Sequence, residues 1–113
     1  MPDVIYVDVE EGSKRVMNNT KLYVRLLTKF KDDHNLKDLE AALAAGEMEK
    51  AQAFAHTIKG LAGNLSLTEL FKQSLELETQ IKAKNVNPEQ LALVKSVYAQ
   101  TLTEADKVIS QNG

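Results

Sequence analysis

The sequence predicts an all-α protein: an up-and-down antiparallel bundle with a four-helix core and short extra helices at its N-terminus. The composition is the first reason, because the 113 residues are rich in helix formers and include only five glycines and two prolines. Apolar residues recur at helical spacing along several segments, and the connections between these segments are short. Short connections make successive helices antiparallel neighbours, and a chain of this length can build one hydrophobic core. We therefore expect a single domain over residues 1–113.

The chain is expected to begin with an extended lead-in over residues 1–8. Residues 4–9 have the composition of a strand, but no second strand is available to pair with them. Asp8 followed by Glu11 resembles a capping box, which predicts a short helix that ends near residues 18–19.

Two further helices should precede the central one. Thr20 is a suitable N-cap for a helix that runs to about residue 32. The residues of this helix that should face the core are Leu22, Leu26, Leu27 and Phe30. After a turn, Asn35 caps a helix over residues 36–45, and Gly46 suits the C′ position that ends it.

The second half of the chain predicts three long helices. The first runs from about residue 47 to residue 65. Ser66 with Glu69 resembles another capping box, and Leu65 with Leu70 a hydrophobic staple, so the next helix should run to about residue 84. Asn87 followed by Pro88 predicts the start of the last helix, which ends near residue 110. Its apolar residues follow helical spacing: Leu91, Val94, Tyr98, Leu102, Ala105 and Ile109.

Composition and charge exclude several classes of function. A net charge of −2 gives no reason to expect nucleic acid or an anionic membrane as a partner. The absence of cysteine excludes disulfides and thiolate zinc sites. No apolar run approaches the roughly 20 residues that span a bilayer, and the N-terminus lacks the apolar run of a signal peptide. We expect a cytoplasmic monomer, with a secreted form that lacks its leader as the alternative.

The segment AHTIKGLAGN, residues 55–64, places a histidine on the polar side of the central helix. On a helical wheel the apolar residues lie opposite His56: Phe54, Ile58, Leu61 and Leu65, flanked by Ala51 and Ala62. The residues on the same side as His56 are Glu49, Gln52, Ala53, Lys59, Gly60 and Gly63. His56 should therefore be exposed among small and polar neighbours.

The neighbours of His56 suit an incoming anion. Lys59 lies one turn away and has no carboxylate three or four residues from it, so its charge is not neutralised along its own helix. Gly60 and Gly63 each cost about 0.5–1 kcal/mol of helix stability relative to alanine, but they clear space beside the imidazole. A cation and cleared space beside a neutral nucleophile fit a phosphate carried by a bulky partner. The alternatives are a merely solvated histidine and glycines that seat a neighbouring helix.

Other histidine chemistry fits poorly. A metal site needs more ligands, but positions 52, 53, 59 and 60 are Gln, Ala, Lys and Gly. Thr57 points about 100° away from His56 on the helix, so it cannot complete a nucleophilic triad. There is no glycine loop that would cradle a nucleotide, which argues against intrinsic kinase activity. His34 lies in a turn and is expected to be a surface residue.

Residues 55–65 resemble the signature of histidine-containing phosphotransfer (HPt) domains, A-H-x-hydrophobic-K-G followed by four residues and a hydrophobic one. Three more segments resemble the family: residues 22–30 before the motif, 39–46 with its L-x-x-A-L-x-x-G pattern, and 75–78 with L-x-x-x-L-E spacing near Glu78. The resemblance covers nearly the whole chain, which would be one HPt-like domain. The chain departs from the family at Ser66, where glycine is common, and the expected capping box accounts for this serine.

The resemblance implies roles for specific residues. His56 would accept a phosphoryl group from a receiver-domain aspartate and pass it to another receiver, with Lys59 near the phosphoryl oxygens. Glu78 would accept a hydrogen bond from the other imidazole nitrogen; the alternative is a solvated glutamate. Gly60, together with Gln52 and Gly63, would form the cleared docking surface.

The resemblance also implies partners and chemistry. The partners would be the receiver domains of a hybrid histidine kinase and of a response regulator. The chain would be a phosphocarrier without kinase activity or a cofactor of its own, and the receiver would supply magnesium. The alternative is a helical interaction module that binds the same partners without phosphotransfer.

Overall fold

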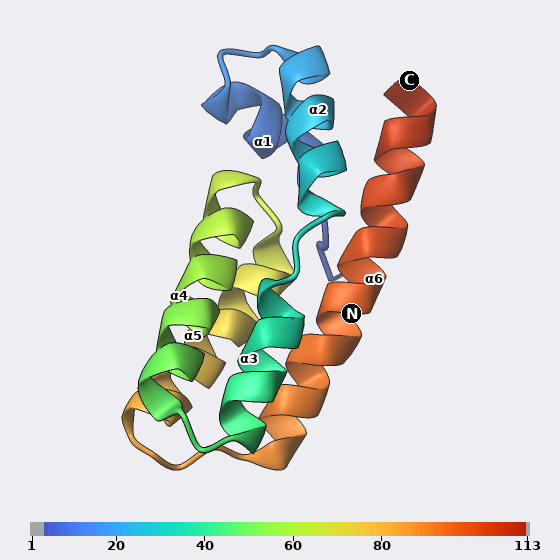
Figure 1. Cartoon of the computed structure of the whole chain (residues 1–113). Helices are drawn as coiled ribbons and strands as arrows, with labels where there is room; N and C mark the ends of the chain where they lie inside the picture. Colours follow the sequence, from blue (N-terminus) through green and yellow to red (C-terminus); the bar gives the residue numbers. More distant parts are fainter. Residues whose placement is uncertain (1–3, 113) are drawn as a thin grey trace.

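The computed structural model describes residues 4–112 and confirms the all-α prediction. Within these residues the chain forms six helices and no strand (Figure 1). They are α1 (Val9–Arg15), α2 (Thr20–Phe30), α3 (Asn35–Ala44), α4 (Met48–Asn64), α5 (Thr68–Lys82) and α6 (Pro88–Asn112). Among the described residues, no helix is both long enough and apolar enough to cross a membrane.

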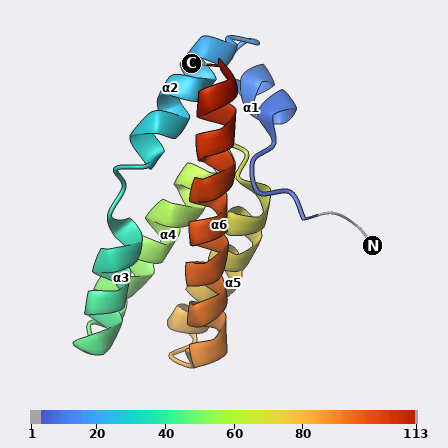
Figure 2. The same ribbon diagram turned by 90° about the vertical axis from the view of Figure 1, so that its right-hand side faces the viewer.

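The helices form a bundle in which α4 lies between α3 and α5. The long helix α6 packs against α5 and also against α2, which stands above α3 in Figure 1. Figure 2 shows α6 running along the length of the molecule, with α2 and α3 beside it. Helix α1 packs on α2. The four-helix core is therefore α3 to α6, and α1 and α2 extend one end.

Side-chain caps set three of the six helix starts in the described residues, those of α1, α2 and α6. The Asp8 side chain accepts a hydrogen bond from the Glu11 N–H, and the Asn87 side chain accepts one from the Glu89 N–H, as capping residues do. The expected caps of α2 and α3 are each displaced by one residue. Asn19, not Thr20, caps α2, and Asn35 is already the first residue of α3.

The lead-in is hydrogen-bonded to the connection between α4 and α5. Its first three residues lie outside the described part of the chain, and residues 4–8 contain no helix or strand. The Asp8 N–H donates to the Ser66 carbonyl at 3.0 Å, and the Glu69 N–H donates to the Ile5 carbonyl at 3.1 Å. These bonds tie the lead-in to the turn between α4 and α5.

That turn corrects one prediction. Helix α5 begins at Thr68 and has no side-chain cap, so Ser66 and Glu69 do not form a capping box. Ser66 instead takes the left-handed conformation, with φ of 55°, which explains why a glycine suits this position. The Ser66 hydroxyl donates to Glu11 and accepts from Arg15, both on α1.

Candidate functional site

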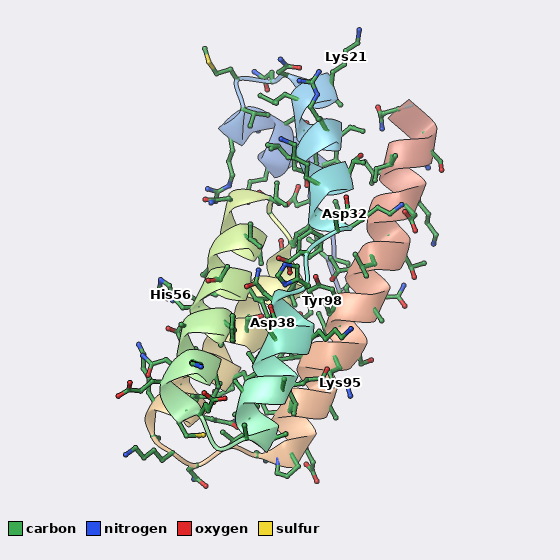
Figure 3. The ribbon with its side chains drawn as sticks, in the orientation of Figure 1. Lys21, Asp32, Asp38, His56, Lys95 and Tyr98 are labelled. Carbon is green, nitrogen blue, oxygen red and sulfur yellow. The ribbon has the colours of Figure 1, made fainter. Side chains whose placement is uncertain are left out.

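His56 lies in the middle of α4 and its side chain is 67% exposed. Figure 3 shows it pointing outward from the bundle. The buried residues of α4 are Ala51, Ala55, Ile58 and Ala62, whereas Phe54 and Leu61 are only half-buried. The predicted apolar stripe is thus rotated towards small residues, because α4 packs closely against both α3 and α5.

Glu78 on α5 orients the imidazole. Its Oε2 lies 3.0 Å from Nδ1 of His56, and its side chain is only 3% exposed. A carboxylate can only accept in this contact, so it favours the tautomer with the proton on Nδ1. The lone pair of Nε2 is then free for an incoming group. The solvated alternative for Glu78 is excluded by its burial.

The charge of Lys59 is neutralised by a carboxylate that lies outside its own helix. Its Nζ lies 2.9 Å from Oε1 of Glu78, and its side chain is 22% exposed. The neutralising carboxylate comes from the next helix, 19 residues along the chain. The prediction that no carboxylate of its own helix neutralises Lys59 holds in the described residues, but Glu78 of α5 neutralises it in the unphosphorylated protein.

Lys82 is a residue of the site that the sequence reasoning missed. Its Nζ lies 3.6 Å from Oε2 of Glu78, one turn along α5. The spacing of four residues between Glu78 and Lys82 was the available signal, since such pairs meet on a helix surface.

The cations around Glu78 keep it charged. Burial by itself would raise the pKa of Glu78. The contacts with Lys59 and His56 and the charge of Lys82 outweigh this effect and hold the pKa below its ordinary value of 4.5. A buried carboxylate that stays ionised is suited to stabilise positive charge on the imidazole beside it.

A shallow depression opens beside His56 between α4 and α5. Gln52 lies in it, as expected for a residue on the His56 side of α4. The full lining is Glu49, Gln52, Ala53, His56, Thr57, Glu78 and Lys82. The lining includes one ammonium group, that of Lys82, and two carboxylates. Glu78 already pairs with Lys59 and Lys82, so the set is a poor one for a divalent cation. No group of three or more potential metal ligands occurs in the described residues.

The two glycines of the motif differ in their surroundings. A Cβ placed on Gly60 would meet no atom within 4 Å outside its own helix, so Gly60 seats no neighbouring helix. A Cβ on Gly63 would lie 3.3 Å from the ring of Phe71 on α5. Gly60 therefore leaves open surface, as predicted, whereas the space beside Gly63 is occupied by an intramolecular contact.

His34 lies apart from this site. It is exposed at the start of α3, and its Nδ1 lies 2.6 Å from Oδ2 of Asp38. The hydrogen bond and charge of Asp38 raise the pKa of His34. His34 lines a separate hollow with both apolar residues, among them Leu26, Phe30 and Leu65, and charged ones; His56 is not part of it.

Comparison with known proteins agrees with this geometry. The family model of the Hpt domain matches residues 25–106, which include His56, Lys59, Glu78 and Lys82. No curated protein and no solved structure matches the chain significantly. The matched segment covers most of the chain, from within α2 to the last third of α6. The chain therefore belongs to the Hpt-domain family, whose members act as histidine phosphocarrier modules of two-component phosphorelays.

Proposed function

We propose that this protein shuttles a phosphoryl group between receiver-domain aspartates through phospho-His56. The observation that carries the proposal is an exposed imidazole whose Nδ1 is held by a buried, ionised carboxylate. This arrangement aims a single nucleophilic nitrogen, Nε2, at solvent on a face that Gly60 leaves open. A solvated histidine without a role would need no such support.

The transfer balances without a proton leaving the site. The Nε2 lone pair attacks the phosphorus of a receiver aspartyl phosphate in line with the departing oxygen. The N–P bond forms as the P–O bond breaks, and the aspartate carboxylate leaves with the electron pair. The ring becomes a cation that keeps its proton on Nδ1, and the Glu78 carboxylate stabilises it through the 3.0 Å contact. Return to a second receiver is the reverse of these steps.

Lys59 and Gly60 serve the approach of the partner. The Lys59 ammonium is one turn from His56, where it can neutralise charge on the phosphoryl oxygens. Gly60 presents no side chain to a docking receiver, and Gln52 on the other side of His56 can contact it. The partners are the receiver of a hybrid histidine kinase and the receiver of a response regulator. Each receiver supplies its own magnesium, since the donors around His56 suit an anion.

Labelling by a phosphorylated receiver tests the proposal. The chain should take up phosphate in an acid-labile, base-stable form, and His56→Gln should abolish the uptake. The matched control is His34→Gln, which removes the chain's other histidine and should leave labelling unchanged. The unfolding free energy of His56→Gln should also lie within about 0.5 kcal/mol of that of the parent, because His56 is exposed.

Two results would contradict the proposal. A receiver that binds the chain but never labels it would favour the alternative, an interaction module without phosphotransfer. Undiminished labelling of the His56→Gln variant would place the acceptor at another residue.

A further inference from the structure

The two carboxylate oxygens of Glu78 contact three side chains, those of His56, Lys59 and Lys82. Oε1 contacts Lys59 at 2.9 Å, whereas Oε2 is shared between His56 at 3.0 Å and Lys82 at 3.6 Å. Lys59 is thus committed to Glu78 in the unphosphorylated protein. The proposed function, however, requires its ammonium at the phosphoryl group on the exposed side of His56.

Moving Lys59 away has a cost that something must offset. Glu78 is almost completely buried, and a buried carboxylate that loses its ion-pair partner is strongly destabilised. The His56 ring gains positive charge on transfer, but the phosphoryl group that it then carries is negative, so its contact with Glu78 compensates only in part. A second ammonium within reach of Glu78 would solve the problem.

Lys82 has the position and the freedom to do this. It lies on the same helix as Glu78, its side chain is exposed, and its Nζ is already close to Oε2. In the described part of the chain, Glu78 is its only ion-pair partner within 4.0 Å. A small rotation of the Lys82 side chain would shorten the 3.6 Å separation to a direct contact.

We propose that Lys82 is a positioning residue that takes over the Glu78 carboxylate when Lys59 turns to the phosphoryl group on His56. The inference rests on the proposed function and adds an exchange of ion pairs to it. Before transfer, Lys59 holds Glu78 and Lys82 waits beside it. As the N–P bond forms, the Lys59 ammonium moves to the phosphoryl oxygens and Lys82 closes on Glu78. The ring proton stays on Nδ1 throughout, so only cations change places.

Single-turnover transfer from a phosphorylated receiver measures the effect of Lys82. Lys82→Met should slow transfer about tenfold, the effect of one lost charge-assisted contact in the transition state. The matched control is Lys72→Met, an exposed lysine of α5 with no ion pair among the described residues. It should leave the rate unchanged.

The Glu78→Gln background separates exchange from direct contact. Without the carboxylate, Lys59 is free and needs no replacement, so Lys82→Met should then change the rate by less than about twofold. An undiminished tenfold loss in this background would show that Lys82 contacts the phosphoryl group or the receiver directly. Equal rates for Lys82→Met and Lys72→Met in the parent background would make Lys82 an ordinary surface lysine. Either result overturns the exchange.

A second measurement does not depend on any receiver. Phosphoramidate can phosphorylate His56 chemically, and NMR of the lysine side chains then reports their surroundings. Phosphorylation should shift the signals of both Lys59 and Lys82 but not that of Lys72; a Lys82 signal that stays constant overturns the exchange. If no receiver labels the chain, the proposed function fails, while this measurement still decides the exchange.

Discussion

At the scale of single residues, the pKa of Glu78 makes the stability of the fold depend on pH. The contacts with Lys59 and His56 keep this pKa below 4.5 in the folded protein, against the effect of burial. A lowered folded-state pKa means that the stabilisation is complete above the unfolded-state pKa and is lost as the pH falls through the folded-state value. The ion-pair contribution of Glu78 should therefore vanish in acid.

Glu78→Gln tests this dependence. At pH 7 the variant should unfold with a free energy lower by about 1–2 kcal/mol, because a charge-assisted contact becomes a neutral one. The difference from the parent should shrink as the pH falls below 4.5, the ordinary value for this group. Denaturant unfolding of both proteins across this range measures it. A difference that stays constant in acid would mean that Glu78 contributes by packing alone.

Lys59→Ala addresses charge neutralisation during transfer. It should slow transfer by about tenfold or more while leaving receiver affinity within about threefold, because Lys59 is only 22% exposed and offers little docking surface. Binding titration and single-turnover kinetics separate the two effects. Weak binding combined with a normal rate in the remaining complex would make Lys59 a docking residue.

At the scale of elements, three glycines with different surroundings give different outcomes for the same change. Gly60 has open space around its Cβ position, so Gly60→Ala should raise the unfolding free energy by about 0.5–1 kcal/mol. A Cβ placed on Gly12 of α1 would overlap the ring of buried Tyr23, so Gly12→Ala should lower the unfolding free energy by about 1–3 kcal/mol. Gly63→Ala should have a small effect, since the Phe71 ring is partly exposed and can move.

A larger substitution at Gly60 tests whether the open surface there serves receiver docking. Gly60→Leu should fold but slow phosphotransfer, because its side chain would stand one turn from His56 in the path of the receiver. Melting curves and labelling rates measure the two effects separately. A lowered melting temperature for both Gly60 variants would contradict the open surface, and normal transfer by Gly60→Leu would place the receiver elsewhere.

In the turn between α4 and α5, Ser66 has two opposite effects on stability: its backbone is strained, and its side chain forms stabilising hydrogen bonds. Ser66 is left-handed, which costs a non-glycine residue about 1–2 kcal/mol, yet its hydroxyl bonds Glu11 and Arg15 of α1. Ser66→Ala keeps the strain and loses the bonds, so it should destabilise by about 1 kcal/mol. Ser66→Gly loses both and should be nearly neutral. Thermal melts of the two variants decide the matter; equal destabilisation would show that strain is absent.

At the scale of the whole molecule, sequence patterns predicted the features that depend on nearby residues, such as helix starts and exposed helix faces. Helix spacing placed His56 on an exposed face, and the caps at Asp8 and Asn87 gave helix starts to within a residue. Contacts between helices were not accessible in this way. The pairing of Lys59 with Glu78 depends on how α4 and α5 meet, and the left-handed Ser66 depends on the turn that joins them. Glu78 was identified only by family resemblance.

The site and the N-terminal end of the fold have separate structural supports. The Hpt family match begins at residue 25, so it leaves out the lead-in and α1. These segments bond to the α4–α5 turn, and α1 covers Tyr23, whose hydroxyl donates to the Leu65 carbonyl at 2.6 Å. They stabilise the turn between α4 and α5, which follows the His56 motif in the chain. None of them contacts the His56, Lys59 and Glu78 cluster among the hydrogen bonds and ion pairs of the described residues.

Removing residues 1–16 should therefore weaken the fold but preserve the chemistry. The shortened chain should lose about 2–4 kcal/mol of unfolding free energy, since Tyr23 becomes exposed and the tethers to the turn disappear. Below its lowered melting temperature it should still accept phosphate on His56 at a rate within about threefold of the full chain, because a change of less than 1 kcal/mol in the barrier is expected. Circular dichroism and receiver labelling measure the two properties. A shortened chain that folds but is not labelled would instead place α1 in the receiver-binding surface.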